Sequence, residues 1–359
     1  MVELSALPAS DTIIAGVGAR TASGLTALQV TMSARAGKFA PRESHMVDRE
    51  GEPIATARLL SIADNVFGLE RFAALAAPPL VQAAHPWVAA QQKRAEGAGL
   101  RVFLALPPAS RPGVDPMLRA QLLPLLASRT RLPLDTARSA VVSGCRGGGI
   151  AAFEMAMGAL ASGEEAVLAG GVDSYFDPDV LEWLDGERRL HGPSTENGFV
   201  PGEGAAFVLL VARRRAGPFE RLGQVLSAAV EMEPNPYGSD RPRLGVGLTR
   251  AVRRAVAAVG ARSRRIPWVM TDVANERHRV DEWMCAMGRN HRAFSEDVVH
   301  DQPLLKTGDV GAASAALLAA MAVTRWQARC AQADVALVAA SSDTPERGAA
   351  VLSVDPGVG

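Results

Sequence analysis

Two segments of this sequence are apolar on nearly every side of a helix, and they constrain the fold more than any other feature. Residues Ile150–Ala161 follow a run of glycines, and residues Gly311–Ala328 begin with a long stretch of Ala, Leu, Met, Val and Gly. A helix without a polar face has to be buried all round. Two such helices predict a layer of helices sandwiched between two β-sheets.

Short apolar or β-branched runs alternate with helical patterns along the chain. Strands are predicted at Thr12–Val17, Arg101–Leu106, Ser139–Ser143, Ala166–Ala169, Phe207–Val211, 223–230, Trp268–Val273, Val335–Ala339 and Ala349–Val354. Helices are predicted at Leu25–Ala36, Asn65–Ala84, Leu118–Ala127, Ile150–Ala161, Val246–Val259, Asp281–Gly288 and Gly311–Ala328. Residues 37–60 are polar and marked by Gly and Pro, which is typical of irregular structure. Strands that alternate with helices favour βαβ units and a mainly parallel sheet.

The second half of the chain repeats the alternation of strands and helices found in the first half. Arg213–Arg215 and the Gly217-Pro218 pair interrupt the pattern, so we predict two similar halves, residues 1–215 and 216–359, fused into one compact unit. The chain contains 34 Gly, and only 5% of its residues are aromatic. This composition suits small-residue helices that have to fit between two sheets.

Charge and cysteine usage narrow the class of protein. Lys and Arg total 38 and Asp and Glu total 38, whereas a nucleic-acid-binding protein would normally carry a basic excess. The three cysteines form no CxxC pair and are too scattered for a disulfide framework, which fits a reducing cytoplasm. The N-terminus has no signal-peptide pattern, and the longest run of small apolar residues is too short to span a bilayer. We therefore expect a cytoplasmic protein with no membrane span and no nucleic-acid partner.

Cys145 is the candidate nucleophile. It lies between a predicted buried strand and a predicted buried helix, where free backbone N–H groups and the helix dipole favour an anion. A thiol in such a position can have a depressed pKa, and the glycines that follow it leave room for a substrate. The alternative is that Cys145 is only a small buried hydrophobic residue. Cys285 and Cys330 lie within helix patterns, which indicates a structural role.

Five segments together resemble the β-ketoacyl synthases of the thiolase-like superfamily. Gly144-Cys145, with the helix that ends in ALASG, resembles the nucleophile segment of that family. The other four occur in the family's order: TIIAGVGARTASG (Thr12–Gly24), LAGGVD (Leu168–Asp173), GEGA (Gly202–Ala205) and GDVGAAS (Gly308–Ser314). The resemblance implies a five-layer αβαβα fold of two pseudo-equivalent halves, normally a homodimer. It also implies acyl thioester substrates on acyl carrier protein or coenzyme A, and no cofactor.

The sequence departs from that family at two histidines. In decarboxylating ketosynthases these histidines face the nucleophile and stabilise the enolate. Here Asn275 occupies the usual position of the first, with His278 three residues later, and Asp309 occupies the position of the second. An amide can still donate a hydrogen bond to a thioester oxygen, but an ionised carboxylate cannot. It would also repel a malonyl carboxylate and raise the Cys145 pKa, which argues against ordinary malonyl decarboxylation.

Several of these residues have two interpretations. Asp309 is either a general base or an N-cap of the helix that follows it. His278 either replaces the lost histidine or lies among the charged residues of its own loop. The remaining histidines show no ligand spacing, so no metal site is expected. Gly16–Thr21 lacks the full dinucleotide fingerprint, which argues against a nicotinamide enzyme. The runs Arg213–Arg215 and Arg262–Arg265 are either solvated edges or docking patches for an acidic carrier protein.

The main functional hypothesis is a divergent ketosynthase-like acyltransferase, of the 3-oxoacyl-(acyl carrier protein) synthase type. It would work in fatty acid, polyketide or related biosynthesis. Cys145 would accept an acyl group, its own N–H and one near Ser342 would bind the oxyanion, and Asn275, His278 and Asp309 would assist. One alternative is a non-condensing partner, resembling a chain-length factor, in a heterodimer with an active ketosynthase. Another is a thioester hydrolase, or an enzyme of acyl transfer to a non-malonyl acceptor, with Asp309 as base. Chain length, acceptor and pathway are left open.

Overall fold

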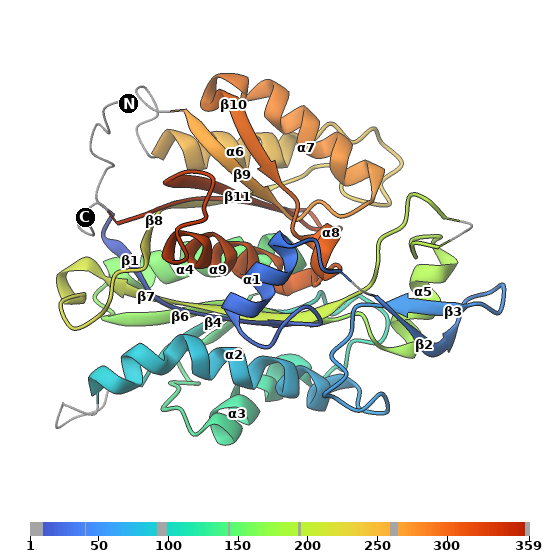
Figure 1. Ribbon diagram of the computed structural model, residues 1–359, viewed down its shortest axis with the longest axis horizontal. Helices are drawn as coiled ribbons and strands as arrows, with labels where there is room; N and C mark the ends of the chain where they lie inside the picture. Colours follow the sequence, from blue (N-terminus) through green and yellow to red (C-terminus); the bar gives the residue numbers. More distant parts are fainter. Residues whose placement is uncertain are drawn as a thin grey trace.

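The fold is a stack of five layers in which helices and sheet halves alternate (Figure 1). The computed structural model describes residues 10–39, 41–91, 99–142, 144–192, 195–258 and 265–355. The central layer holds α4 (Cys145–Ala161) and α9 (Ser314–Gln327), and helices cover the outer face of each sheet half. The outer helices are α2 (Gly68–Gln91) and α3 (Leu118–Thr130) on one side, and α6 (Val246–Ala258) and α7 (Arg277–Arg289) on the other. The expected αβαβα arrangement is confirmed.

Within the described residues, the two sheet halves form one hydrogen-bonded ladder of ten strands. The first half runs, from its edge, β5 (Ala140–Val142), β4 (Arg101–Ala105), β6 (Ala166–Ser174), β7 (Glu203–Ala212) and β1 (Thr12–Thr21). The second half runs, from its edge, β10 (Phe294–Asp301), β9 (Ile266–Thr271), β11 (Val335–Ser341), β12 (Glu346–Ser353) and β8 (Gly223–Met232). The halves join where Ile13 and Ile14 of β1 pair with Gln224 and Gly223 of β8.

The two halves share one topology. In each half, the strands of the large sheet can be counted in chain order. The third strand lies at the edge, and the second, fourth, fifth and first strands follow it across the sheet. The second strand of each half pairs in parallel with its third and fourth, and the remaining pairs are antiparallel. The expectation of a mainly parallel sheet is therefore wrong, because β7 and β12 each run back beside the strand before them. We propose the turn between β7 and β8 as the boundary between the halves.

Helix α9 is buried on all sides, as its composition predicts, whereas α4 is buried along most of its length but exposes Met155 and Gly158. Residues Ala315–Val323 of α9 have no exposed surface, and α4 packs against both β6 and β12. Two glycines make this closeness possible. A Cβ on Gly149 would lie 2.7 Å from the Cβ of Ala315, and one on Gly171 would overlap the Ala312 carbonyl. Helix α4 can approach α9, and β6 can approach the turn before α9, only because these two positions carry no side chain.

Several local predictions are corrected by the structure. Residues 37–60 are not wholly irregular, since β2 (Arg42–Val47) and β3 (Pro53–Thr56) form a small antiparallel sheet. Helix α2 does not stop near Pro86 but continues to Gln91, because its packing on β1 outweighs the hydrogen bonds that its prolines remove. Three further elements were not predicted: α5 (Pro178–Gly186), β10 and α8 (Leu304–Thr307). Helix α7 also begins four residues earlier than predicted, at Arg277. Ser143, Val259 and residues 262–264 lie outside the described residues.

No helix in the described part of the chain is both long enough and apolar enough to cross a bilayer.

Candidate active site

Cys145 lies in a strained turn between β5 and α4. Gly144 has a φ of 115° and Cys145 a φ of 46°, both in the left-handed region. For a residue with a side chain, this conformation costs on the order of 1 kcal/mol and persists only where the surroundings enforce it. A Cβ on Gly144 would lie 2.8 Å from the Glu346 Cγ, so glycine is required there. The turn holds Cys145 at the first position of α4.

A cavity of about 320 Å³ opens beside Cys145. Its lining includes Arg111, Cys145, Tyr175, Trp183, Asp343 and Thr344. These residues come from the loop after β4, the start of α4, the segment after β6, helix α5 and the turn between β11 and β12. The volume lies at the small end of the range for ligand pockets, about 300–1,000 Å³.

Burial raises the pKa of the Cys145 thiol to about 12. Arg146 and Arg111 favour the thiolate, while Asp173 and Asp343 oppose it, and removal from water outweighs the arginines. The depressed pKa expected from the helix N-terminus is therefore reversed by the tertiary environment. Near neutral pH, Cys145 is a protonated thiol.

Arg146 and Asp309 form a buried ion pair directly behind the candidate nucleophile. Both side chains are fully buried. The Arg146 Nε donates to Asp309 Oδ1 at 3.3 Å, and its Nη2 donates to Oδ2. Asp309 Oδ1 also accepts the Gly311 N–H at 2.9 Å, at the turn that leads into α9. Both oxygens of Asp309 thus have donors, in the two-pronged arrangement that holds a guanidinium most firmly.

Asp272 flanks the same guanidinium from the end of β9. Its Oδ2 lies 3.8 Å from the Arg146 Nε and accepts the Ser341 N–H at 2.9 Å. Burial raises the Asp272 pKa to about 6, although Arg279 and Arg146 favour its ionised form. The sequence pattern did not predict a role for Arg146 or Asp272. One signal was present, because a charged residue inside a Gly-rich apolar segment has to be paired when the segment is buried.

Asn275 and His278 do not line the cavity beside Cys145. The Asn275 amide is exposed and donates to the carbonyls of Glu196 and Gly198, the latter at 3.1 Å. Burial lowers the pKa of His278 to about 3, so its ring is neutral at pH 7. The ring packs 4.8 Å from that of Tyr237, and its Nε2 lies 3.9 Å from the Asp343 Oδ1. The catalytic roles given to these two residues stay predictions.

A second charge cluster fixes the turn between β11 and β12. One oxygen of Asp343 accepts a hydrogen bond from Arg189 Nη1 at 3.0 Å, and the other accepts one from Arg279 Nη2. The same two arginines bind Glu276 through their Nε atoms, at 2.7 and 2.9 Å. Ser342 joins this turn to α4, because its hydroxyl donates to the Gly144 carbonyl and accepts the Gly147 N–H. The Ser342 N–H itself donates to Glu346, so that N–H is engaged within the turn.

The region around Cys145 is similar in sequence to known proteins. The model of the family "Beta-ketoacyl synthase, N-terminal domain" matches residues 130–216, which include α4, β6 and β7. The actinorhodin polyketide putative beta-ketoacyl synthase 2 of Streptomyces coelicolor is 31% identical over 141 residues. That match covers 35% of this chain and 34% of the relative, so it spans about a third of the relative's length.

Solved structures match over nearly the whole chain. The ishigamide ketosynthase/chain length factor has a TM-score of 0.70 at 19% identity, covering 96% of this chain and 99% of its own. A type II polyketide acyl-carrier protein in complex with its ketosynthase (AntDE:AntF) has a TM-score of 0.76 at 12% identity, covering 97% and 100%. The module 6 ketosynthase of the bacillaene synthase from Bacillus subtilis has a TM-score of 0.76 at 14% identity, covering 96% and 72%.

Residues 130–216 are therefore similar to the N-terminal domain of β-ketoacyl synthases, and the chain has the fold of solved ketosynthases. Within this ketosynthase-like fold, the GEGA motif has a structural role, because its Glu203 binds Arg71 through two hydrogen bonds of 2.6 and 2.7 Å. Both side chains are buried. Among the described residues, no group of three His, Cys, Asp or Glu side chains is arranged to hold a metal ion.

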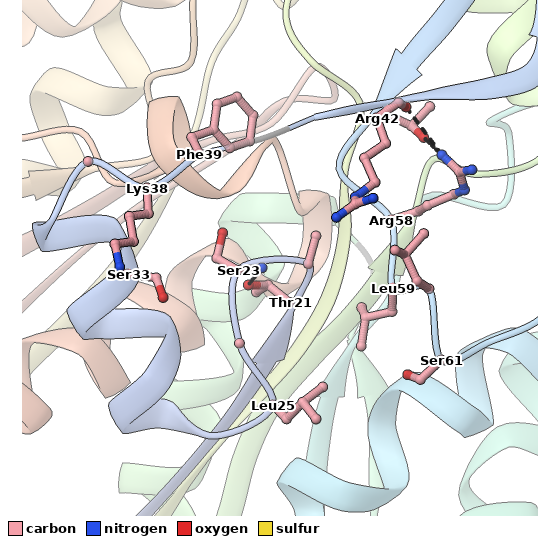
Figure 2. A pocket seen from close by; sticks show the side chains of 15 residues that line it. Thr21, Ser23, Leu25, Ser33, Lys38, Phe39, Arg42, Arg58, Leu59 and Ser61 are labelled. Carbon is pink, nitrogen blue, oxygen red and sulfur yellow. Dashed lines mark hydrogen bonds between the residues drawn. The ribbon is translucent and has the colours of Figure 1, made fainter.

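A larger hollow of about 660 Å³ lies elsewhere in the first half of this ketosynthase-like chain, and none of the four predicted catalytic residues lines it. Figure 2 shows Lys38 on one side of it and Arg42 and Arg58 on the other.

The arginine run after β7 is partly paired, since Arg213 binds Asp355 at 2.9 Å and Arg215 binds Glu165 at 3.4 Å. Of the second run, Arg265 binds Glu296 at 3.4 Å.

Proposed function

We propose that this chain is a non-condensing, ketosynthase-like subunit. It accommodates acyl groups delivered as thioesters in the cytoplasm and works with an active ketosynthase. The main support is that Asp309 stands where decarboxylating ketosynthases have a histidine, and that two hydrogen bonds hold it on Arg146. Asp309 and Asp272 flank the same Arg146 guanidinium, and an ionised carboxylate cannot donate a hydrogen bond to an enolate as the family histidines do. Burial keeps Cys145 protonated, and Asp309, the base expected to activate it, is engaged by Arg146 and Gly311.

Two partners follow from the similar structures. One of these is a ketosynthase/chain length factor, and another is an acyl-carrier protein in complex with its ketosynthase. We transfer both relationships to this chain as a proposal, with an acyl carrier protein as the donor and a ketosynthase as the dimer partner. A homodimer and acyl-CoA as donor are the alternatives, and the co-expression below distinguishes the homodimer from the heterodimer.

Acyl transfer through Cys145 is the second candidate function. It is favoured by the strained φ of Cys145 and by the cavity at its side. The thiol sulfur would attack the thioester carbonyl, the carrier thiolate would leave, and the Cys145 proton would pass to that thiolate. Hydrolysis with Asp309 as base has less support, because both its oxygens are bound to Arg146 or Gly311.

The experiment combines two measurements. The purified chain is incubated with malonyl- and acyl-carrier thioesters while carbon dioxide release and intact mass are followed. It is also co-expressed with ketosynthases of the same organism and analysed by native mass spectrometry. We expect no decarboxylation, no β-ketoacyl product and a stable heterodimer. A homodimer that decarboxylates malonyl-carrier would contradict the proposal.

The matched variant for the second candidate is Cys145→Ala. An acyl adduct on the wild type that is absent from Cys145→Ala would establish acyl transfer. Equal adducts on both proteins would exclude Cys145 as the acceptor.

A further inference from the structure

The hollow of about 660 Å³ in the first half of the chain is lined by basic and neutral residues alone. Three segments form it: the turn after β1, the end of α1 with the segment that leads into β2, and the segment after β3. Of the 15 described residues that line it (Figure 2), three are cationic and none is acidic. Because the chain as a whole has no net charge, the hollow is a local positive region that attracts an anion.

One of the three cations has a structural role. Arg58 Nε donates to Asp64 Oδ1 at 3.0 Å, and its Nη2 donates to Asp64 Oδ2 at 3.2 Å. Its Nη1 donates to the carbonyls of Arg42 and Glu43, both at 3.2 Å, and so holds the start of β2 against the end of β3. Since Asp64 neutralises this guanidinium, Arg58 shapes the hollow and adds little to its charge.

Lys38 and Arg42 supply the charge of the hollow. Both are exposed, and within the described part of the chain neither side chain forms an ion pair. They lie on opposite sides of the hollow (Figure 2). A phosphate monoester has three terminal oxygens and up to about two charges, so it can accept hydrogen bonds from both sides at once. A carboxylate directs its two oxygens toward one side, where a single guanidinium satisfies them.

Two leucines give the same hollow an apolar surface. Leu25 and Leu60 line it and expose 53% and 57% of their surface. Leu28, in the first turn of α1, exposes 55%. A single exposed leucine is ordinary, but two of them in one hollow, beside two free cations, indicate a ligand that is apolar as well as anionic.

We propose that this hollow binds a phosphate monoester that carries an apolar chain. Lys38 and Arg42 bind the phosphate, and the chain lies on Leu25 and Leu60. The volume of the hollow is within the range of ligand sites, about 300–1,000 Å³. Such a ligand is either a soluble alkyl phosphate or the headgroup of an anionic lipid in a membrane. The site is separate from the Cys145 cavity and does not depend on the proposed function.

The first measurement uses soluble probes and the whole chain. In isothermal titration calorimetry, we expect octyl phosphate to bind at least about tenfold more tightly than inorganic phosphate, which lacks the chain, and than octyl glucoside, which lacks the charge. Added salt should weaken its binding, because exposed cations are screened. No binding of octyl phosphate would overturn the proposal. Equal binding of inorganic phosphate would overturn the role of the leucines, and equal binding of octyl glucoside that of the cations.

Matched variants identify the cations responsible. Lys38→Gln combined with Arg42→Gln removes both charges from exposed side chains and should lower the affinity for octyl phosphate at least about tenfold. The control combines Arg250→Gln with Arg253→Gln, two exposed arginines of α6 in the other half of the chain, and should leave the affinity unchanged. Thermal unfolding verifies that both variants are folded. An equal loss of affinity in the control would show that the effect comes from overall charge, and would contradict the site.

Vesicles distinguish the two sources of the ligand. Sedimentation of the chain with phosphatidylcholine vesicles that contain phosphatidic acid, but not with pure phosphatidylcholine, would support a lipid headgroup, provided that the Lys38/Arg42 variant no longer sediments. Binding of octyl phosphate without sedimentation on either vesicle would support a soluble phosphate ester. Equal sedimentation on both vesicles would contradict recognition of the phosphate charge.

Discussion

Arg146 and Asp309 tie the two halves of the protein together at the candidate nucleophile. The two residues are 163 positions apart, and their paired hydrogen bonds connect the first turn of α4 to the segment before α9. Because both side chains are fully buried, neither can exchange its partner for water. The arrangement of charge next to Cys145 is therefore a fixed part of the fold.

Loss of one member of this pair should destabilise the protein strongly. We expect Asp309→Asn to lower the free energy of unfolding by about 3 kcal/mol, since it leaves a buried guanidinium short of countercharge. The control is Asp281→Asn, which removes an exposed pair with Arg277 and should cost less than about 1 kcal/mol. Urea unfolding measures both. Equal losses would mean that the buried pair contributes no more than a surface pair.

Asp272 should make stability fall as the pH rises. Its pKa is raised by burial to about 6, so between pH 4 and 6 the folded protein holds more protons than the unfolded chain. Its contribution is most favourable below pH 4, and it is lost as the pH rises through 6. The unfolding free energy of the wild type, minus that of Asp272→Asn, should decrease by about 3 kcal/mol between pH 4 and 7. A constant difference across this range would contradict the assignment.

His278 should act in the opposite direction. Burial lowers its pKa to about 3, so the folded protein holds the neutral ring while the unfolded chain takes up a proton below about pH 6.5. The contribution is present above pH 6.5 and is lost as the pH falls. Relative to His278→Gln, the wild type should gain roughly 2 kcal/mol between pH 5 and 7.5. Chemical denaturation at a series of pH values measures this, and a gain toward low pH would show that the ring is charged in the fold.

Cys145 should react slowly with alkylating reagents. A pKa of about 12 leaves only a small fraction of thiolate at pH 7.5, roughly a thousandfold less than an ordinary cysteine has. Cys285 is exposed and should be labelled first by iodoacetamide. Peptide mapping over time follows each cysteine separately, and in urea the two rates should converge. Labelling of native Cys145 as fast as Cys285 would indicate an activated thiolate.

Gly144 should not tolerate a side chain. Its φ of 115° and the 2.8 Å approach of Glu346 predict that Gly144→Ala destabilises by more than about 2 kcal/mol. Gly158 lies in the same helix with open space around its Cα, so Gly158→Ala should be neutral or stabilising by up to about 1 kcal/mol. Thermal unfolding of the two variants gives the comparison. Similar melting temperatures would argue against the strained turn.

The sequence by itself determined the layer architecture and the position of Cys145. A helix without a polar face has to be buried between other layers, and α9 follows this rule completely while α4 follows it except on the side of Met155 and Gly158. The Gly-rich start of α4 likewise required a tight turn from strand to helix. These properties depend on side chains that are near each other in the chain.

Only the tertiary structure decided the chemistry around Cys145. The partners of Arg146 come from the end of β9 and from the segment before α9, and no local pattern connects them. The same holds for the pKa of Cys145, which the helix N-terminus alone would lower and which burial under the β11–β12 turn raises. Asn275 lies in the expected loop, yet its amide is bound to carbonyls of residues 196 and 198. Burial and ion pairing depend on which distant segments meet, and that is settled when the two halves close around the central helices.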